Sequence, residues 1–321
     1  MSEKQALAVR VVDIKAMSPH VKQFTLVDEH GEALPAFSSG SHVCVTFGDG
    51  QRSWRNAYSL IGDPGGLECY QIAVRKGDTT HSRGGSIYLH EAINTGDQLQ
   101  ISPPANFFPL ARHARKHILI AGGIGITPIL SHLAYLRRVN ASYELHYAFR
   151  DDAFVDAFRQ REDNHIHLYD ATAGQRLDLT QALDRQPLGT HVYVCGPHSL
   201  ITATRTAAAE LGWPLDHIHS EEFAPLPPED SQPFIVAIPS YGLTVNVAAE
   251  QSLLSVLEDA GVPIASSCRA GRCGTCRIRV VEGVAKHRDQ FLTEQERATG
   301  LMLACISRAC GESLTVELLT P

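Results

Sequence analysis

The first hundred residues alternate short apolar runs with polar turn residues. Between Leu7 and Ile101 the apolar runs are LAVRVVDI, VKQFTLV, HVCVTF, CYQIAV and QLQI. Gly, Pro and Asp separate these runs, which is typical of strands joined by turns. We therefore expect an antiparallel barrel or sandwich over residues 1–107, with one short helix near Ser86 to Ile93.

The pattern changes after Pro109, where apolar strands begin to alternate with helical stretches. A strand at 117–121 leads into the glycine-rich turn GGIGITP and then into a helical pattern. YELHYAF and HVYVCGP are further strands, and helical segments lie near Phe154 and Leu200. Strands that alternate with helices favour a parallel α/β nucleotide-binding domain, here over residues 108–224.

A proline-rich segment separates this region from a third one. Residues 224–233 hold four prolines in ten positions, which predicts an interdomain linker at 225–233. Beyond it, FIVAI and LTVNV predict a hairpin, and Ser252 to Ala260 predicts a helix. The last domain is expected over residues 234–321, and the sequence contains no internal repeat.

The composition is that of an ordinary globular protein and argues against two classes of partner. The chain has 321 residues, 44% of them hydrophobic and 20% charged, and a formal net charge of -7. This acidic balance provides no basic surface for nucleic acid. No run reaches the roughly 18 apolar residues of a membrane span, and the N-terminus lacks the layout of a signal peptide. We expect a cytoplasmic protein with no membrane partner.

The cysteines are unevenly distributed, and their spacing points to a metal cluster. In a reducing cytosol they are not expected to form a disulfide framework. Cys268, Cys273 and Cys276 follow the spacing Cys-x4-Cys-x2-Cys, and Cys305 lies further along. This spacing is that of a plant-type [2Fe–2S] site, with all four thiolates as iron ligands.

Two glycines and one further cysteine bear on this interpretation. Gly271 and Gly274 allow the backbone to curl so that its amides point at the sulfurs. A structural zinc site is the alternative, but such sites usually have two close cysteine pairs. Cys310 is a second candidate for the fourth ligand. We favour Cys305 because it follows the apolar run LMLA, whereas Cys310 lies in a predicted turn.

Groups that suit a flavin gather at the ends of two predicted strands and in a glycine-rich turn. The first strand end offers a cation, a ring and a hydroxyl in Arg55, Tyr58 and Ser59, which suit the phosphate, the ring or ribityl chain, and the N5 edge of a flavin. Alone, such residues are more often surface and core. Two further segments strengthen the hypothesis: Ala73-Val74-Arg75 and Ser82-Arg83-Gly84-Gly85-Ser86. The second lies at a predicted helix start, where free backbone donors favour phosphate.

The turn AGGIGITP supplies the features of a dinucleotide site. Gly122, Gly123 and Gly125 follow a strand and precede a helix, so they permit close approach of a pyrophosphate. A later strand ends in Cys195-Gly196-Pro197, which places an uncharged thiol where a nicotinamide ring could stack against the flavin. A purely structural Cys195 is the alternative.

One strand end bears on the choice of nucleotide. The strand YELHYAF is followed by Arg150-Asp151-Asp152. A carboxylate at this place can accept hydrogen bonds from ribose hydroxyls and repel a 2′-phosphate. Asp151 therefore predicts NADH over NADPH, unless Arg150 binds that phosphate instead.

The cluster loop, GGIGITP, YVCGP and SRGGS together resemble the phthalate dioxygenase reductase family over essentially the whole chain, and within it the reductases of carnitine monooxygenase and of aromatic-ring oxygenases. The resemblance implies a multi-domain fold. Its parts would be an antiparallel β-barrel flavin domain, a parallel-sheet α/β nucleotide domain and an α+β ferredoxin domain of the β-grasp type.

The same resemblance implies FMN as the flavin, beside NADH and the [2Fe–2S] cluster. The flavin contacts that it implies are Tyr58, Ser59, Ala73, Val74, Arg75, Arg83, Gly84, Ser86 and Thr127, with Phe223 covering the ring. The family motif is Arg-x-Tyr-Ser, whereas two residues separate Arg55 from Tyr58 here.

We therefore expect an NADH-dependent oxidoreductase. Hydride would pass from nicotinamide to flavin, and single electrons would leave through the cluster to a terminal Rieske-type oxygenase. The cofactors carry this chemistry, so Ser59 and Cys195 are only the nearest candidates for catalytic residues. The rivals are a monooxygenase that acts directly on an organic substrate and a ferredoxin-like redox sensor. The oxygenase and its substrate cannot be named from the sequence.

Four arginines, Arg269, Arg272, Arg277 and Arg279, surround the cluster loop. They predict a positive docking surface for the oxygenase, which would speed encounter and be screened by salt. The alternative is that they pair with Glu282, Glu294 or Glu317 inside the domain.

Overall fold

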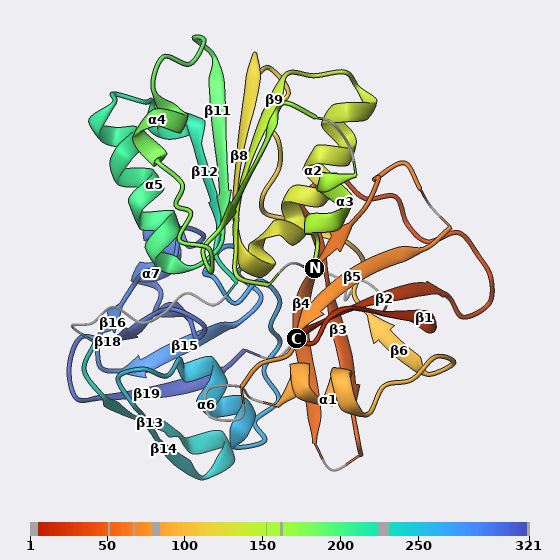
Figure 1. Cartoon of the computed structure of the whole chain (residues 1–321). Helices are drawn as coiled ribbons and strands as arrows, with labels where there is room; N and C mark the ends of the chain where they lie inside the picture. Colours follow the sequence, from red (N-terminus) through yellow and green to blue (C-terminus); the bar gives the residue numbers. More distant parts are fainter. Residues whose placement is uncertain are drawn as a thin grey trace. The chain divides into compact units, whose positions relative to one another are not determined.

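The computed structural model describes residues 6–50, 52–66, 68–78, 84–151, 153–160, 163–223 and 231–319, and Figure 1 shows its elements. The chain forms two compact units, Met1–Glu222 and Phe223–Pro321. Within the described ranges no helix is both long and apolar enough to cross a membrane. The greater part of the expected linker, 225–230, lies outside the described residues.

A closed antiparallel barrel forms the first half of the first unit. Its strands are β1 (Leu7–Ser18), β2 (Val21–Asp28), β3 (Ser41–Gly48), β4 (Ser53–Ile61), β5 (Tyr70–Arg75), β6 (Gln98–Ile101) and β7 (Ala105–Asn106). The sheet order is β4-β5-β2-β1-β6-β3-β7, and pairing of β3 with β4 closes it. The barrel alternative of the sequence analysis is thus the correct one.

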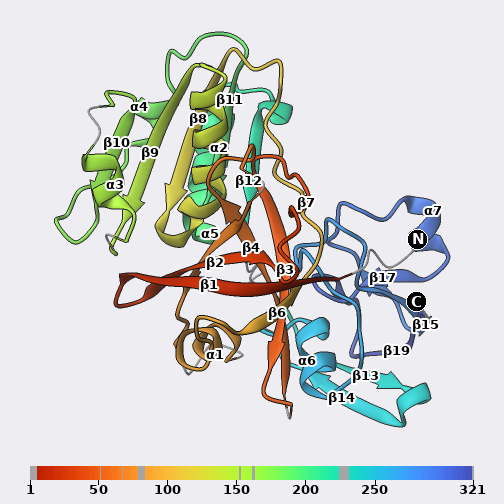
Figure 2. The same cartoon turned by 90° about the vertical axis from the view of Figure 1, so that its right-hand side faces the viewer.

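The barrel is held by apolar side chains that alternate along its strands. Val9 and Val11 of β1 are fully buried, whereas Arg10 between them is exposed. The long β1–β2 hairpin extends across the barrel (Figure 2). One helix, α1 (Gly85–Glu91), contributes Leu89 to the barrel core. It lies within one residue or two of the helix expected near Ser86 to Ile93.

A parallel five-stranded sheet, the nucleotide lobe, forms the second half of this unit. Its strands are β8 (Lys116–Gly122), β9 (Tyr143–Phe149), β10 (Ile166–Asp170), β11 (Thr190–Cys195) and β12 (Ile218–Glu221), in the order β10-β9-β8-β11-β12. The chain reverses direction across the sheet between β8 and β11. Their carboxyl ends therefore form the topological switch point, where such folds bind ligands.

Helices cover both faces of this sheet (Figure 1). On one face lie α2 (Ile126–Arg138) and α3 (Val155–Arg159), and on the other α4 (Leu179–Leu183) and α5 (His198–Glu210). Short 3-10 turns, Gly123–Gly125 and Leu215–His217, precede α2 and β12. Successive strand residues point to opposite faces, so two separate apolar cores result.

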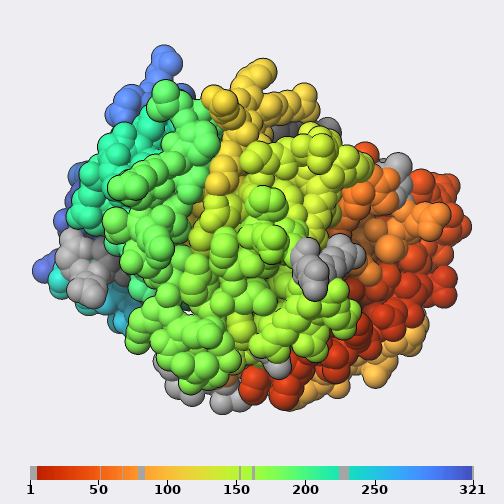
Figure 3. Space-filling model, turned by 45° about the horizontal axis from the view of Figure 1, so that its top comes forward, coloured from red at the N-terminus to blue at the C-terminus, as the bar shows by residue number. Residues whose placement is uncertain are grey.

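The core on the α2 side is shared with the barrel. Val21, Ile61 and Ala73 of the barrel belong to the same buried cluster as Ile126 of α2 and Leu119 of β8. In the space-filling view the red-to-orange barrel surface abuts the yellow-to-green surface of the lobe (Figure 3). The two halves are therefore joined by packed side chains, and the expected division at 107/108 stays a prediction.

The second unit is a small α+β fold around one five-stranded sheet, as expected for the ferredoxin domain. The sheet strands are β13 (Phe234–Ile238), β14 (Leu243–Val247), β15 (Arg277–Glu282), β17 (Leu301–Leu303) and β19 (Ser313–Leu318), in the order β14-β13-β19-β15-β17. The remaining elements are the 3-10 turn Pro239–Tyr241, α6 (Leu253–Asp259), β16 (Ala285–Lys286), α7 (Glu294–Ala298) and β18 (Arg308–Ala309).

Helix α6 illustrates why this unit folds as its sequence predicts. The Ser252 side chain caps its first turn by accepting a hydrogen bond from the Ser255 amide, which satisfies an otherwise unpaired donor. Leu253, Leu254 and Leu257 then bury one face against the sheet. The helix precedes the cysteine loop, and its Glu258 contacts Arg269 of that loop.

Candidate functional site

The cysteine loop connects α6 to β15, and its backbone folds around the thiols. The Ala270 and Arg272 amides donate hydrogen bonds to Cys268 Sγ at 3.4 and 3.3 Å, and the Thr275 amide donates to Cys273 Sγ at 3.5 Å. Amides aimed at sulfur stabilise negative charge there and tune its redox behaviour. The curl expected from the sequence is therefore present.

Left-handed backbone makes this curl possible. Arg269, Gly271 and Gly274 have φ values of 53, 70 and 69°. A side chain at Gly271 would come within 2.8 Å of Ile306, and one at Gly274 would run into the Phe291 ring. Positions 271 and 274 thus need glycine, both because the backbone is left-handed and because no space is left for a side chain.

The four predicted ligands come together in pairs. The Cys268 thiol hydrogen-bonds to that of Cys273, which lowers the pKa of Cys273 to about 5, and Cys276 is hydrogen-bonded to Cys305, which lowers the pKa of Cys276. Cys276 and Cys305 are buried. The same hydrogen bonds, together with burial, raise the pKa values of Cys268 and Cys305. Four thiols that converge in this way, one of each pair with a lowered pKa, fit a thiolate-bound metal cluster.

Cys310 takes no part in this arrangement. It is exposed, and its amide donates to the Val284 carbonyl next to β16. This geometry supports Cys305 as the fourth ligand, although the ligand set itself stays a proposal.

Two of the arginines around the loop are committed to carboxylates. Arg269 makes a two-pronged contact with Glu258, 2.5 and 3.1 Å long, and Arg277 lies 3.6 Å from Glu296. These are not the acidic residues weighed from the sequence, but the effect is the same. These carboxylates offset part of the positive charge that the sequence predicts around the loop.

In the barrel, β4 presents the predicted flavin residues on two faces. Register with β3 is regular from His42↔Ser59 to Gly48↔Ser53, so residues three apart point to opposite sides. Arg55 is exposed and faces away from Tyr58. The side chain beside Tyr58 is instead Asn56, whose Nδ2 donates to the Tyr58 hydroxyl at 3.2 Å.

Asn56 and Trp54 were missed by the sequence analysis. Both lie under the start of α1, where a side chain at Gly85 would come within 2.6 Å of Asn56 and 3.1 Å of Trp54. Gly84 is left-handed, with a φ of 88°. The only available signal was the two-residue spacing of Asn56 from Tyr58, which puts both on one face of a strand.

The remaining flavin candidates divide by burial. Burial raises the pKa of Tyr58 to about 12, so its hydroxyl stays protonated. Ser59, Ala73 and Val74 are buried, whereas Arg75 is exposed at the end of β5. Ser86 accepts a hydrogen bond from the Gly77 amide. Arg83 and Ser82 lie outside the described residues.

The turn after β8 brings the nucleotide motif to the barrel. Thr127 is buried and donates through Oγ1 to the Ile124 carbonyl at 3.0 Å. Ile126 beside it shares a core with Ala73 of β5. The predicted flavin and nucleotide segments therefore meet at one junction.

The glycines of this turn have different uses. Side chains at Gly122 or Gly125 would meet Pro197, Leu200 or the Cys195 backbone, so both positions serve loop-to-loop packing. Gly196 packs equally closely, since a side chain there would come within 3.0 Å of the Gly122 backbone. Gly123 alone among the three glycines of the motif has open space around it, at a left-handed φ of 53°.

Cys195 and Asp151, the predicted nicotinamide and ribose contacts, both make contacts within the protein. Cys195 is fully buried in the core shared with the barrel. Asp151 accepts hydrogen bonds from Ser18 Oγ at 2.7 Å and from the Ala153 amide at 3.1 Å. Phe223, the last residue before the undescribed stretch, is 43% exposed. Their roles toward a nucleotide or flavin stay predictions.

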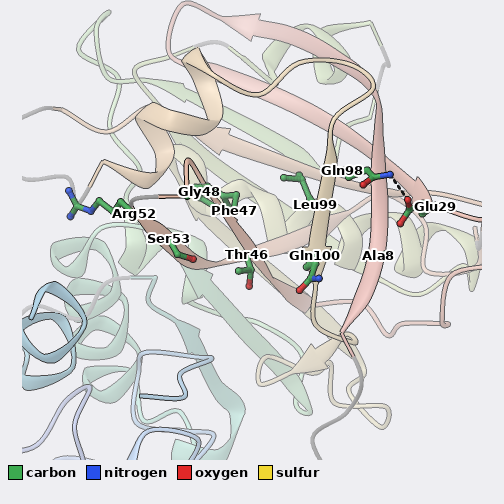
Figure 4. A pocket seen from close by; sticks show the side chains of 11 residues that line it. Ala8, Glu29, Thr46, Phe47, Gly48, Arg52, Ser53, Gln98, Leu99 and Gln100 are labelled. Atoms are coloured by element: carbon green, nitrogen blue, oxygen red, sulfur yellow. Dashed lines mark hydrogen bonds between the residues drawn. The ribbon is translucent and has the colours of Figure 1, made fainter. Parts of the chain in front are cut away.

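A pocket of about 530 Å³ opens elsewhere on the barrel (Figure 4). It is lined by the ends of β1, β3 and β6, including Thr46, Phe47, Leu99 and Gln100. Gln98 donates to Glu29 at its rim. None of the predicted flavin residues that the structure describes lines it, so this hollow is not the flavin site that we expected.

Family models match the chain in two places. Residues 236–310 match the 2Fe-2S iron-sulfur cluster binding domain. Residues 99–218 match the N-terminal domain of the dimethylamine monooxygenase subunit DmmA-like family. The first match covers the cysteine loop and the second covers the nucleotide lobe.

Whole-length similarity extends to known reductases. The chain is 44% identical to the haem-dependent oxidative N-demethylase beta subunit of Ectopseudomonas mendocina, covering 97% of this chain and 99% of that protein. It is 43% identical to the carnitine monooxygenase reductase subunit of Escherichia coli, covering 99% and 100%. The solved structure of phthalate dioxygenase reductase matches 98% of this chain and 99% of its own, with 32% identity and a TM-score of 0.77.

A flavin-type barrel joined to a nucleotide lobe, followed by a plant-type cluster domain, defines the class of iron–sulfur electron-transfer reductases. Within that class, the chain belongs to the phthalate dioxygenase reductase family, the reductase subunits of oxygenase systems. It is an oxidoreductase that carries electrons from a pyridine nucleotide. The predictions of family, fold class and enzyme class are confirmed.

Proposed function

We propose that this chain accepts hydride from NADH on FMN and delivers single electrons to a terminal Rieske-type oxygenase. The electrons would leave through a [2Fe–2S] cluster bound by Cys268, Cys273, Cys276 and Cys305. The convergence of four thiols in a chain that also carries a nucleotide lobe is the observation that supports this most strongly. When bound, FMN supplies the exchange between two-electron and one-electron chemistry. The cysteine usage also supports a cytoplasmic location.

The barrel residues would bind and orient the flavin. Tyr58 retains its proton and offers a hydroxyl fixed by Asn56. Ser59 lies on β4, which contacts α2, and Thr127 lies on α2 itself. A hydroxyl at this junction of barrel and lobe can hydrogen-bond to a ring edge. The burial of both side chains would help to exclude water from a flavin bound here.

The nucleotide would lie across the switch point. Open space at Gly123 admits a pyrophosphate, while the packing of Gly125 on Cys195-Gly196 fixes the two loops against each other. We assign the preference for NADH to Asp151, because a carboxylate repels a 2′-phosphate. Its bonds to Ser18 and Ala153 hold that charge in position.

Asp151→Asn tests the nucleotide preference. The ratio of kcat/KM for NADH to that for NADPH should fall by about tenfold, equivalent to about 1.4 kcal/mol. Ser18→Ala is the matched control, because it removes the hydrogen bond and keeps the carboxylate. A wild-type enzyme that prefers NADPH would show that the assignment is wrong.

A haem-dependent oxygenase is a second candidate for the partner. A relative that is 44% identical is named as a haem-dependent oxidative N-demethylase subunit. The solved structure of a self-sufficient cytochrome P450 monooxygenase matches 97% of this chain over 41% of its own, with 36% identity and a TM-score of 0.71. Carnitine, which occurs in a relative's name, is a quaternary ammonium compound, and dimethylamine, which occurs in the description of a matching family, is a secondary amine. Oxidation of an N-methylated substrate by the partner suits either candidate.

Two measurements test the proposal. Rapid NADH-driven reduction of cytochrome c distinguishes a reductase from a redox sensor. Supply of electrons to a purified Rieske oxygenase or to a haem N-demethylase then decides between the partners. A neighbouring gene with a Rieske Cys-x-His motif and a two-histidine, one-carboxylate iron site would identify the first kind. Failure to reduce any one-electron acceptor would contradict the whole proposal.

A further inference from the structure

A cluster of two histidines and a glutamate lies on the outer part of the nucleotide sheet, away from every group discussed so far. Glu144 and His146 are two residues apart on β9, so they share a face of the sheet. His167 is the register partner of His146 on the neighbouring strand β10. Strand pairing therefore places all three side chains together.

The three ligand atoms lie at distances that suit one metal ion. The Nε2 atoms of His146 and His167 are each 3.2 Å from Glu144 Oε1, and all three atoms lie within 4.8 Å of one another. Tetrahedral zinc with bonds of about 2.0–2.1 Å has ligand atoms about 3.3 Å apart. The two distances from Glu144 Oε1 to the imidazole nitrogens thus already have the required length.

The third distance, between the Nε2 atoms of the two imidazoles, can shorten by rotation of a side chain. Their rings are stacked, with centroids 4.8 Å apart and an angle of 19° between planes. The His146 side chain is only 5% exposed, whereas that of His167 is 41% exposed. His167 can therefore rotate toward a fixed His146, and an ion can enter from its side.

Surrounding groups orient the ligands for binding. Among the described residues, His146 Nε2 is buried and makes no hydrogen bond of proper geometry, although it faces Glu144. Its Nδ1 lies 3.0 Å from the Tyr169 hydroxyl, the kind of contact that sets the tautomer of a metal-binding histidine. Lys116 Nζ contacts the other carboxylate oxygen of Glu144 at 2.7 Å, which leaves Oε1 directed at the imidazoles.

We propose that Glu144, His146 and His167 form a binding site for a divalent cation of the zinc type, with water as the fourth ligand. Imidazole and carboxylate ligands suit this class of ion. The ammonium of Lys116 nearby opposes the added charge, so the expected affinity is moderate. Glu144 and His167 each lie one residue from the start of their strands, opposite the carboxyl ends that bind the nucleotide.

This position predicts what the ion does. It links β9 to β10, and β10 is the edge strand of the sheet. An ion that binds only the folded lobe stabilises it by mass action. Hydride transfer and electron delivery should be unaffected, since no predicted cofactor residue belongs to the cluster.

Calorimetric titration of the cluster-loaded, full-length protein with zinc chloride tests the proposal, alongside thermal unfolding with and without zinc. The variant is His167→Gln, because an exposed side chain can be changed without loss of folding. The matched control is His165→Gln, an exposed histidine two residues away on the same edge. Iron content and cluster absorbance are followed throughout, so that zinc exchange at the cysteines is recognised.

Wild-type protein and His165→Gln should each bind one zinc ion more than His167→Gln, and zinc should raise their melting temperature by a few degrees. His146→Gln, read by binding alone, should match His167→Gln. Equal zinc binding by wild type and His167→Gln would overturn the proposal. Zinc uptake that occurs only with matching loss of iron would overturn it as well.

Discussion

The two units of the chain differ in the charge state of their buried polar groups. In the first unit these groups include histidines that burial keeps neutral, such as His42, His117, His132 and His146. In the second unit they include the thiols Cys276 and Cys305, whose charge the proposed cluster would balance once both bind iron as thiolates. The first unit therefore depends on its proton occupancy, and the second depends on its cluster.

The units also differ in how their sites are assembled. The cysteine loop takes three of its four thiols from nine consecutive residues, 268–276. The flavin and nucleotide junction takes its groups from β4, β5, α1 and α2, which are far apart along the chain. A single substitution in the site should thus cause a large loss of activity in the second unit and a smaller, partial loss in the first.

Replacement of one cluster ligand should give the largest effect. Cys273→Ser removes one of four iron ligands, so cytochrome c reduction should be almost abolished while NADH still reduces the flavin. The second unit should also lose stability, because metal binding and folding are coupled. Cys310→Ser is the control and should behave as wild type. A Cys273→Ser protein with full iron and sulfide would show that the ligand assignment is wrong.

Acid should destabilise the first unit before the second. Burial lowers the pKa of His42 to about 4 and that of His132 to about 3, from 6.5 when unfolded. The unfolded chain thus binds protons more readily, and stability is complete above pH 6.5 and declines as pH falls toward 4. At pH 5 each residue should cost about 2 kcal/mol.

Thermal unfolding between pH 7.5 and 5 measures this loss, with cluster absorbance reporting on the second unit. His42→Asn should flatten the pH dependence of the first transition, since it removes one titrating group. A first transition that does not move with pH would contradict the contrast between the units.

Glycine replacements should give a smaller effect in the nucleotide lobe. A methyl group at Gly125 meets the Cys195 carbonyl carbon and, at 2.7 Å, the Gly196 amide, so Gly125→Ala should cost about 1–3 kcal/mol by overpacking. Gly123→Ala meets no atom within 4 Å, so its cost to stability should be only the backbone strain of a left-handed alanine, about 1 kcal/mol, and its main effect should be a higher KM for NADH. Unfolding free energies and KM values, compared between the two variants, separate packing from binding. Identical effects would show that the division drawn between these glycines is wrong.

The smallest effect is expected at the docking surface. Because Arg269 and Arg277 contact carboxylates, Arg272→Glu should slow electron delivery to the oxygenase only a few-fold and flatten its salt dependence. Arg185→Glu makes the same charge change at an exposed position of the first unit and is the control. Stopped-flow rates of electron delivery to the oxygenase, measured for all three proteins at several salt concentrations, test this prediction. Wild-type rates for Arg272→Glu at low salt would rule out a steering role.

The sequence predicted the parts of the molecule that depend on local spacing. The thiol loop with Gly271 and Gly274 and the helix capped by Ser252 all lie within short stretches, where spacing alone determines which groups meet. The parallel sheet of the nucleotide lobe was indicated by the alternation of strands and helices. For these features no knowledge of distant contacts was needed.

Residues whose role depends on strand pairing were harder to predict. Arg55 and Tyr58 lie three residues apart, so the pleat of β4 turns them to opposite faces and brings Asn56 beside Tyr58. Gly122 and Gly125 match a phosphate-binding motif, yet their space is taken by the loop after β11. In both cases a tertiary contact decides what a locally suitable residue does.

The core shared by the barrel and the nucleotide lobe has a consequence for exchange of parts between relatives. Ile61 and Ala73 pack in one cluster with Ile126 and Leu119, so a chimera joined near residue 107 would need both halves of that cluster to have coevolved. A cut after Glu222 crosses no such cluster among the described residues. Evolution and engineering alike should therefore recombine the iron–sulfur unit as a cassette and inherit the barrel and lobe as a single piece.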